Sequence, residues 1–129
     1  MVRYLLDTHT LLWFITEDED LSDRARQLIL DSNNEIFLSI ASLWEIAIKV
    51  NIGKLVLDKP FNQLFPDELD SHGIEILNIT INSLIHLTTL PFHHRDPFDR
   101  LIIAQALDEG ISVISVDSAL DPYGVNREW

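Results

Sequence analysis

Residues 96–117 read Asp-Pro-Phe-Asp-Arg-Leu-Ile-Ile-Ala-Gln-Ala-Leu-Asp-Glu-Gly-Ile-Ser-Val-Ile-Ser-Val-Asp. The spacing predicts a helix over 97–109 that is apolar nearly all round, and such a helix belongs in a protein interior. Gly110 is a typical residue for the end of a helix, and the apolar run 111–116 predicts a strand directly after it. The stretch therefore indicates a buried helix that leads into a buried strand, as in α/β proteins.

The rest of the chain repeats this alternation of short apolar strands with helices. Three further strands are predicted at 2–6, 36–40 and 74–77, and a fifth near Val125. The other helices are predicted at 8–15, 21–30, 42–50, 64–72 and 81–88. Such alternation predicts parallel pairing and a three-layer α/β/α sandwich with a central, mainly parallel sheet of four or five strands.

Length and composition predict one domain spanning residues 1–129, since 47% of the 129 residues are hydrophobic. The chain has no cysteine, which excludes disulfides and fits a reducing, cytoplasmic environment. The first six residues are too short for a signal peptide. No apolar run approaches the roughly 20 residues of a membrane span, so no membrane association is expected.

The charge balance is strongly acidic, with 9 Lys and Arg against 21 Asp and Glu and a formal net charge of −12. Proteins that hold nucleic acid through its phosphates usually present a basic face. An acidic chain can still act on phosphodiesters if some of its acids bind cations. The plainer alternative is that most of the acids keep the surface solvated.

Four acids fall at one edge of the predicted sheet. Asp7 and Asp117 close the first and fourth strands, Glu45 lies one turn into the helix after the second strand, and Asp99 lies one turn into the helix before the fourth. Crowded carboxylates raise one another's pKa unless a cation offsets their charge. Mg²⁺ or Mn²⁺ suits oxygen ligands and leaves room for a substrate phosphate. The four acids are therefore the predicted metal ligands and catalytic residues.

Each acid also has a purely structural alternative. Residues 42–45 fit a capping box, and Glu45 stands four before Lys49, the favourable order for a helix ion pair. Asp96 fits a helix N-cap that is followed by proline at the first helical position. The two strand-end acids fit a helix cap and a turn residue.

Four motifs together resemble a known family. They are 7–13 (Asp-Thr-His-Thr-Leu-Leu-Trp), 39–49 with its internal Glu, 93–106 with His-His-Arg-Asp-Pro-Phe-Asp-Arg, and 115–117 (Ser-Val-Asp). In this order they resemble the PIN-domain nucleases, and most of all the VapC-like toxins of bacterial toxin–antitoxin pairs. The resemblance runs from Val2 to about Tyr123.

The resemblance implies that Asp7, Glu45, Asp99 and Asp117 match the family's four acids, which bind Mg²⁺ or Mn²⁺ and support RNA hydrolysis. It implies a PIN-like parallel-sheet sandwich. It also implies a homodimer and a cognate antitoxin whose tail occupies the active-site groove.

Further residues of the same motifs are candidates for supporting roles. By the resemblance, Ser39 matches a small hydroxyl position near the site. Asp96 is interpreted as the helix cap that at most supports a ligand. Arg100, with Arg95 and Lys49, is a candidate for contact with the RNA backbone or for ordinary ion pairing.

Histidine and tryptophan side chains near the motifs admit two uses. His9, His93 and His94 could contact phosphate or move protons, although surface histidines are more common. Trp13 and Trp44 could stack on bases, although burial against a helix is the more common use.

Other functions remain to be weighed against the nuclease. A receiver domain needs paired acids after the first strand and a late lysine, but Thr8 and His9 follow Asp7 and no lysine follows Lys59. A haloacid-dehalogenase phosphatase needs a second aspartate where His9 stands. A catalytically silent PIN-like module that binds RNA or protein remains the alternative, which four filled acidic positions disfavour.

Overall fold

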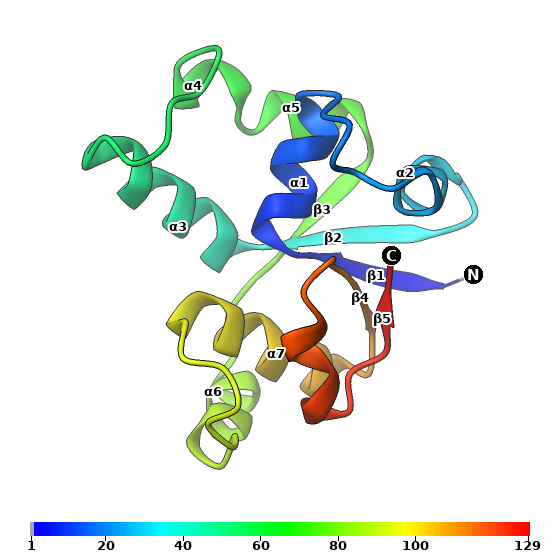
Figure 1. Ribbon diagram of the computed structural model, residues 1–129, viewed down its shortest axis with the longest axis vertical. Helices are drawn as coiled ribbons and strands as arrows, with labels where there is room; N and C mark the ends of the chain where they lie inside the picture. The colour runs from blue at the N-terminus through cyan, green and yellow to red at the C-terminus, as the bar shows by residue number, and fades with distance from the viewer. Residues whose placement is uncertain (1) are drawn as a thin grey trace.

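The computed structural model describes residues 2–129 and contains one parallel β-sheet with helices on both faces (Figure 1). Within that range, five strands lie in the order β3-β2-β1-β4-β5, and all neighbouring pairs are parallel. The strands are β1 Arg3–Leu6, β2 Glu35–Ser39, β3 Ile74–Leu77, β4 Ser112–Ile114 and β5 Arg127–Glu128. The predicted three-layer α/β/α sandwich is confirmed.

The helices follow the predicted order. They are α1 Thr8–Ile15, α2 Asp23–Leu30, α3 Ile40–Asn51, α4 Phe61–Leu64, α5 Asp67–Ser71, α6 Ile81–Thr88, α7 Pro97–Glu109 and the 3₁₀ helix η1 Ser118–Tyr123. The predicted helix 64–72 is instead split at Pro66, because proline has no N–H and interrupts a helix interior. Across 2–129, no helix combines the length and apolarity that crossing a membrane requires.

Strand β1 is buried on both faces and separates two hydrophobic clusters. Tyr4 and Leu6 belong to the cluster under α1, α2 and α3, whereas Leu5 belongs to the cluster under α6 and α7, in keeping with the alternation of side chains along a strand. Figure 1 shows α1 and α2 on one side of the sheet and α6 and α7 on the other. Ile102 and Ile103 of α7 are fully buried, as the apolar pattern of this helix predicts.

Buried hydrogen bonds join the end of β2 and the start of α3 to α7. Ser39 caps α3 by accepting the N–H of Ala41 at 3.0 Å, and its hydroxyl donates to Oε1 of Gln105 on α7. The amide of Gln105 then donates to the carbonyls of Leu77, the last residue of β3, and of Asn78 after it. Ser39 therefore fixes the start of α3 against α7, and this places both helices at one edge of the sheet.

We predict that Ile103→Ala lowers the free energy of unfolding by about 2–5 kcal/mol, because it opens a cavity in a filled core. Ile103 is 0% exposed, whereas Ile85 on α6 is 58% exposed. Ile85→Ala is the matched control and should change the free energy of unfolding by less than about 0.5 kcal/mol. Urea unfolding measures both, and equal effects would contradict the assignment of the core.

Candidate active site

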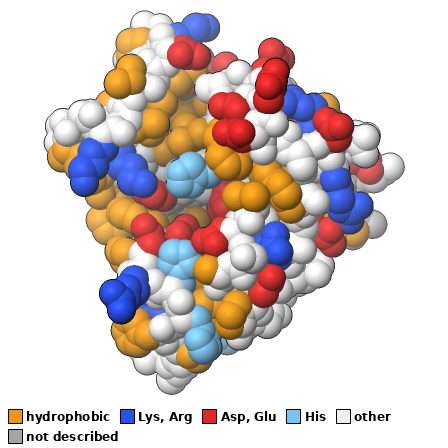
Figure 2. Space-filling view, viewed as in Figure 1, with side chains coloured by type: hydrophobic (Ala, Val, Ile, Leu, Met, Phe, Trp, Pro, Cys, Tyr) orange, Lys and Arg blue, Asp and Glu red, His pale blue; other side chains and the backbone are white. Residues whose placement is uncertain are grey.

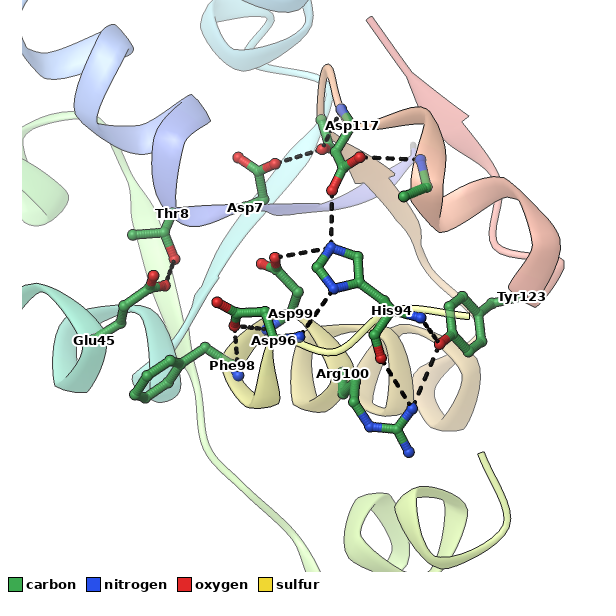
Figure 3. A network of polar contacts seen from close by, with 12 residues as sticks. Asp7, Thr8, Glu45, His94, Asp96, Phe98, Asp99, Arg100, Asp117 and Tyr123 are labelled. Atoms are coloured by element: carbon green, nitrogen blue, oxygen red, sulfur yellow. Dashed lines mark hydrogen bonds and ion pairs between the residues drawn. The ribbon is translucent and has the colours of Figure 1, made fainter. Parts of the chain in front are cut away.

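Acidic side chains meet at the edge of the sheet where β1, β2 and β4 end. Asp7 directly follows β1, Asp117 lies beyond β4, Glu45 lies in the second turn of α3 and Asp99 in the first turn of α7. Figure 2 shows acidic side chains around a hollow in this face of the molecule. Figure 3 shows Asp7, Asp99 and Asp117 reaching toward the same space, with Glu45 to one side. The topology therefore brings Asp7, Asp99 and Asp117 to one hollow and leaves Glu45 at its side.

Asp99 has the most perturbed carboxylate of this group. Its pKa is raised from 3.8 to about 7, mainly by burial and in part by the charges of Asp96, Glu45 and Asp7, while His94 acts in the opposite direction. A carboxylate that resists ionisation among other carboxylates is where a cation would be bound most favourably. Such perturbed groups are also frequent at functional sites.

His94 lies between two of the acids. Its Nε2 is 3.2 Å from Oδ2 of Asp99 and 3.0 Å from Oδ2 of Asp117. Each of the three residues offers one atom that could coordinate a metal, and these atoms all lie within 4.8 Å of one another. The loop before α7 thus inserts an imidazole into the acidic cluster (Figure 3).

Asp7 and Asp117 are helix caps as well as members of the cluster. Oδ1 of Asp7 accepts the N–H of Thr10 at 2.7 Å, and its Oδ2 accepts the hydroxyl of Ser115. Oδ1 of Asp117 accepts the N–H of Ala119 at 3.0 Å. The cap expected at Asp7 is confirmed, whereas Asp117, expected to be a turn residue, caps η1. Capping does not exclude a second role, because both acids also face the same hollow (Figure 3).

Glu45 is buried and has a partner for each oxygen. The Thr8 hydroxyl donates to Oε1 at 2.7 Å, and the Lys49 ammonium lies 2.6 Å from Oε2. The hydrogen bond to Glu45 raises the pKa of Lys49. The predicted ion pair with Lys49 is confirmed, but the capping box is wrong: Ser39 caps α3, and Ser42 lies inside the helix.

The supporting residues named from the sequence have mainly structural contacts. Asp96 caps α7 by accepting the N–H groups of Phe98 and Asp99 at 2.9 and 3.0 Å, as its position predicts. The buried guanidinium of Arg100 donates to the carbonyls of Leu90 and Pro91 at 3.1 and 2.8 Å. An RNA contact at Arg100 would need an exposed guanidinium, so this candidate role gives way to one of holding the loop.

The aromatic side chains are placed differently from expectation. Trp44, expected to be buried, is 58% exposed and meets the ring of Phe98 edge-on at 5.2 Å. Trp13 is partly buried against Trp129, with ring centroids 5.8 Å apart. Trp44 therefore presents an aromatic surface next to Glu45 in the chain.

Three side chains that hold the acids in place were not assigned this role from the sequence. Thr8 and Ser115 each lie close in the chain to an acid at a strand end, and a hydroxyl in that position is the signal that could have identified them. The sequence leaves the role of His94 open, as it does for His9 and His93. Its contacts depend on the conformation of the loop before α7, for which the sequence carries no comparable signal.

The donor set fits a hard divalent cation. The groups that converge are carboxylates, which Mg²⁺ and Mn²⁺ prefer, and one of them is the carboxyl of Asp99 with its raised pKa. A bound cation would offset the repulsion between the crowded carboxylates. The residues present can therefore hold such an ion.

Comparison with known families identifies a match along almost the whole chain. The family model described as PIN domain matches residues 4–125. A curated relative, Ribonuclease VapC16 of Mycobacterium tuberculosis (strain ATCC 25618 / H37Rv), is 37% identical over 60 residues, which are 46% of this chain and 43% of that protein. The match thus spans less than half of the relative's length.

Solved structures share the fold at low sequence identity. VapBC2 from Rickettsia felis, bound to a DNA fragment from its promoter, gives a TM-score of 0.73 at 17% identity over 98% of each chain. DNA-bound VapBC from Salmonella typhimurium gives 0.73 at 19% identity over 99% of this chain and 98% of that one. FitAcB from Neisseria gonorrhoeae gives 0.66 at 18% identity over 96% and 95%.

We predict that Asp99→Asn makes the cation-free protein more stable than the parent at about pH 8. Because the pKa of Asp99 is raised in the folded state, from 3.8 to about 7, its contribution to stability is full below the unfolded pKa and is lost as the pH rises through the folded pKa. Asparagine cannot ionise, so the variant lacks this loss.

The measurement is the thermal midpoint from about pH 4 to pH 8 in the presence of a chelator. The difference between variant and parent should grow in favour of the variant as the pH rises. Asp20→Asn, an exposed aspartate far from the cluster in the chain, is the control and should show no such trend. A constant difference for Asp99→Asn would contradict the raised pKa.

Proposed function

The chain belongs to the PIN domain family, and we propose that it is a metal-dependent endoribonuclease that hydrolyses RNA phosphodiester bonds as the toxin of a toxin–antitoxin pair. The observation that carries this proposal is the convergence of acids at one edge of the sheet. Ligand atoms of His94, Asp99 and Asp117 lie within 4.8 Å of one another, and partial burial together with the charges of Asp96, Glu45 and Asp7 raises the pKa of Asp99 to about 7. A divalent cation bound there would offset the repulsion between these carboxylates. The relative named Ribonuclease VapC16 supports the activity.

Asp7, Glu45, Asp99 and Asp117 would hold Mg²⁺ or Mn²⁺. When bound, the ion lowers the pKa of a coordinated water and offsets negative charge on the phosphate. One catalytic domain, spanning residues 1–129, would then suffice for hydrolysis.

The chain's own side chains orient the acids for this role. The hydroxyl of Thr8 donates to Glu45, and that of Ser115 donates to Asp7. Partners that orient ligands in this way are a regular part of metal sites. Both hydroxyls leave further lone pairs on the carboxylates available, since each oxygen can accept more than one bond.

Substrate contact would depend on a few residues around the cluster. Arg95 is exposed in the loop before α7, and Lys49 lies within reach of Glu45; such side chains position a phosphate backbone without reading its sequence. The exposed ring of Trp44 offers a face on which an unpaired base can stack. These features favour single-stranded RNA.

A protein partner fits a cavity next to the acids. The cavity has a volume of about 510 Å³ and is lined by α1, α3 and the segment 54–58, with Thr8 and Lys49 among its residues. Its lining is mostly apolar, with Lys54 also present, so it suits an extended segment with apolar and acidic side chains. We propose a cognate antitoxin as that partner, a homodimer as the assembly and the cytoplasm as the location.

We predict that Asp7→Asn and Asp99→Asn each lower Mn²⁺- or Mg²⁺-dependent RNA cleavage by about 100-fold or more, because even residues that merely orient metal ligands contribute 10–100-fold. Cleavage of a labelled single-stranded RNA by the purified protein, with the cation or with a chelator, measures the effect. Asp20→Asn is the control and should cut like the parent.

Two results would count against the nuclease. If Asp7→Asn cuts as fast as the parent, these acids are not the catalytic residues. If the parent binds RNA but cuts none with either cation, the silent binding module is the better description. Co-purification with the product of a neighbouring reading frame tests the antitoxin separately.

We also predict that Mg²⁺ strengthens RNA binding by a non-cleaving variant, since the acids of the cluster oppose a polyanion and a cation bound among them offsets part of their charge. Fluorescence anisotropy of Asp7→Asn with labelled RNA measures affinity with Mg²⁺ and with chelator at equal ionic strength. Equal affinities would show that the cation has no part in holding the substrate.

A further inference from the structure

We propose that His94 is a positioning residue whose Nε2–H holds the carboxylates of Asp99 and Asp117 toward one cation. The proposal rests on the metal-dependent function above and adds a residue to it. His94 bridges acids from two different elements, α7 and the segment after β4. Without the imidazole, two like charges would face each other there.

The tautomer of His94 follows from its other nitrogen. Nδ1 accepts the backbone N–H of Asp96 at 3.1 Å, so Nδ1 carries a lone pair. In the neutral ring the proton therefore lies on Nε2, the nitrogen that faces both acids. Nε2–H can donate to Oδ2 of Asp117 at 3.0 Å and to Oδ2 of Asp99 at 3.2 Å.

The same tautomer argues against His94 as a metal ligand. Coordination through Nε2 would require the lone pair there and the proton on Nδ1. The Nδ1 proton would then point at the N–H of Asp96, which caps α7 and is fixed by that helix. The geometry therefore favours a donor that orients two ligands over a ligand in its own right.

Hydrogen bonds from Tyr123 and Arg100 hold the backbone of the loop that carries His94. The N–H of His94 donates to the hydroxyl of Tyr123 at 2.7 Å, and that hydroxyl donates to the carbonyl of Pro91 at 2.8 Å. Arg100 donates to Pro91 from beneath, and the ring of Phe92 covers its guanidinium at 3.9 Å. Arg100 and Tyr123 thus support the imidazole through the backbone of residues 91–94 (Figure 3).

The first test measures Mn²⁺ affinity by calorimetry on five proteins: the parent, His94→Leu, His94→Gln, His93→Leu and Asp99→Asn. His94→Leu, which keeps bulk but no donor, should raise the Kd for Mn²⁺ by about 10–100-fold, the range for partners of metal ligands. His94→Gln, whose amide can donate in place of Nε2–H, should stay close to the parent. His93→Leu is the matched control: His93 is exposed and packs edge-on to Tyr123, so the Kd should not change.

The second test needs no variant. In the ¹⁵N spectrum of the parent's imidazole groups, Nδ1 of His94 should be unprotonated and Nε2 protonated, both before and after saturation with Mg²⁺. A proton that moves to Nδ1 on Mg²⁺ addition would identify His94 as a ligand and overturn the positioning role.

The remaining outcomes separate this inference from the proposed function. If His94→Leu binds Mn²⁺ as tightly as the parent while Asp99→Asn does not, only the role of His94 fails. If Asp99→Asn also binds like the parent, the metal site itself is wrong. Thermal midpoints of all variants within a few degrees of the parent's would show that a change in Kd does not arise from unfolding.

Discussion

Repulsion between carboxylates at one edge of a parallel sheet is the constraint that the rest of this structure must satisfy. The topology brings Asp7, Asp99 and Asp117 to one hollow, and burial makes the charge of Asp99 more costly there. Hydrogen-bond donors surround these acids. They are backbone N–H groups at helix starts, the hydroxyl of Ser115 and the imidazole of His94. These donors keep the acids in place, so that a divalent cation could bind between them.

Helix capping and metal binding are compatible in this arrangement. A helix N-terminus carries a partial positive charge and free N–H groups, so an acid there is stabilised in its ionised form. Asp7 and Asp117 each use Oδ1 as a cap, which fixes the direction of the second oxygen. The structural and functional interpretations of the sequence therefore could not be separated by pattern, because one side chain serves both.

The sequence predicts what depends on local pattern. The bounds of α1, α6 and α7 agree with expectation, because periodicity and caps mark their ends, and the edge position of the four acids follows from strand order. The structure contradicts two expectations, Ser42 as a helix cap and Trp44 as a buried side chain. It also shows Arg100 bound to backbone carbonyls, which the sequence does not predict. Each depends on how α3, α7 and the loop between α6 and α7 pack, which are tertiary contacts without a short-range signature.

Net charge is a poor guide to RNA contact in such a protein, because at physiological ionic strength interactions are screened over about 8 Å. What an approaching phosphate meets is the local balance at the cluster. Lys49 already faces Glu45, Arg95 extends from the neighbouring loop, and a divalent cation would add two further positive charges. Together they would offset most of the acids at the site. An acidic protein could therefore bind RNA at a site where positive charges offset its own acids.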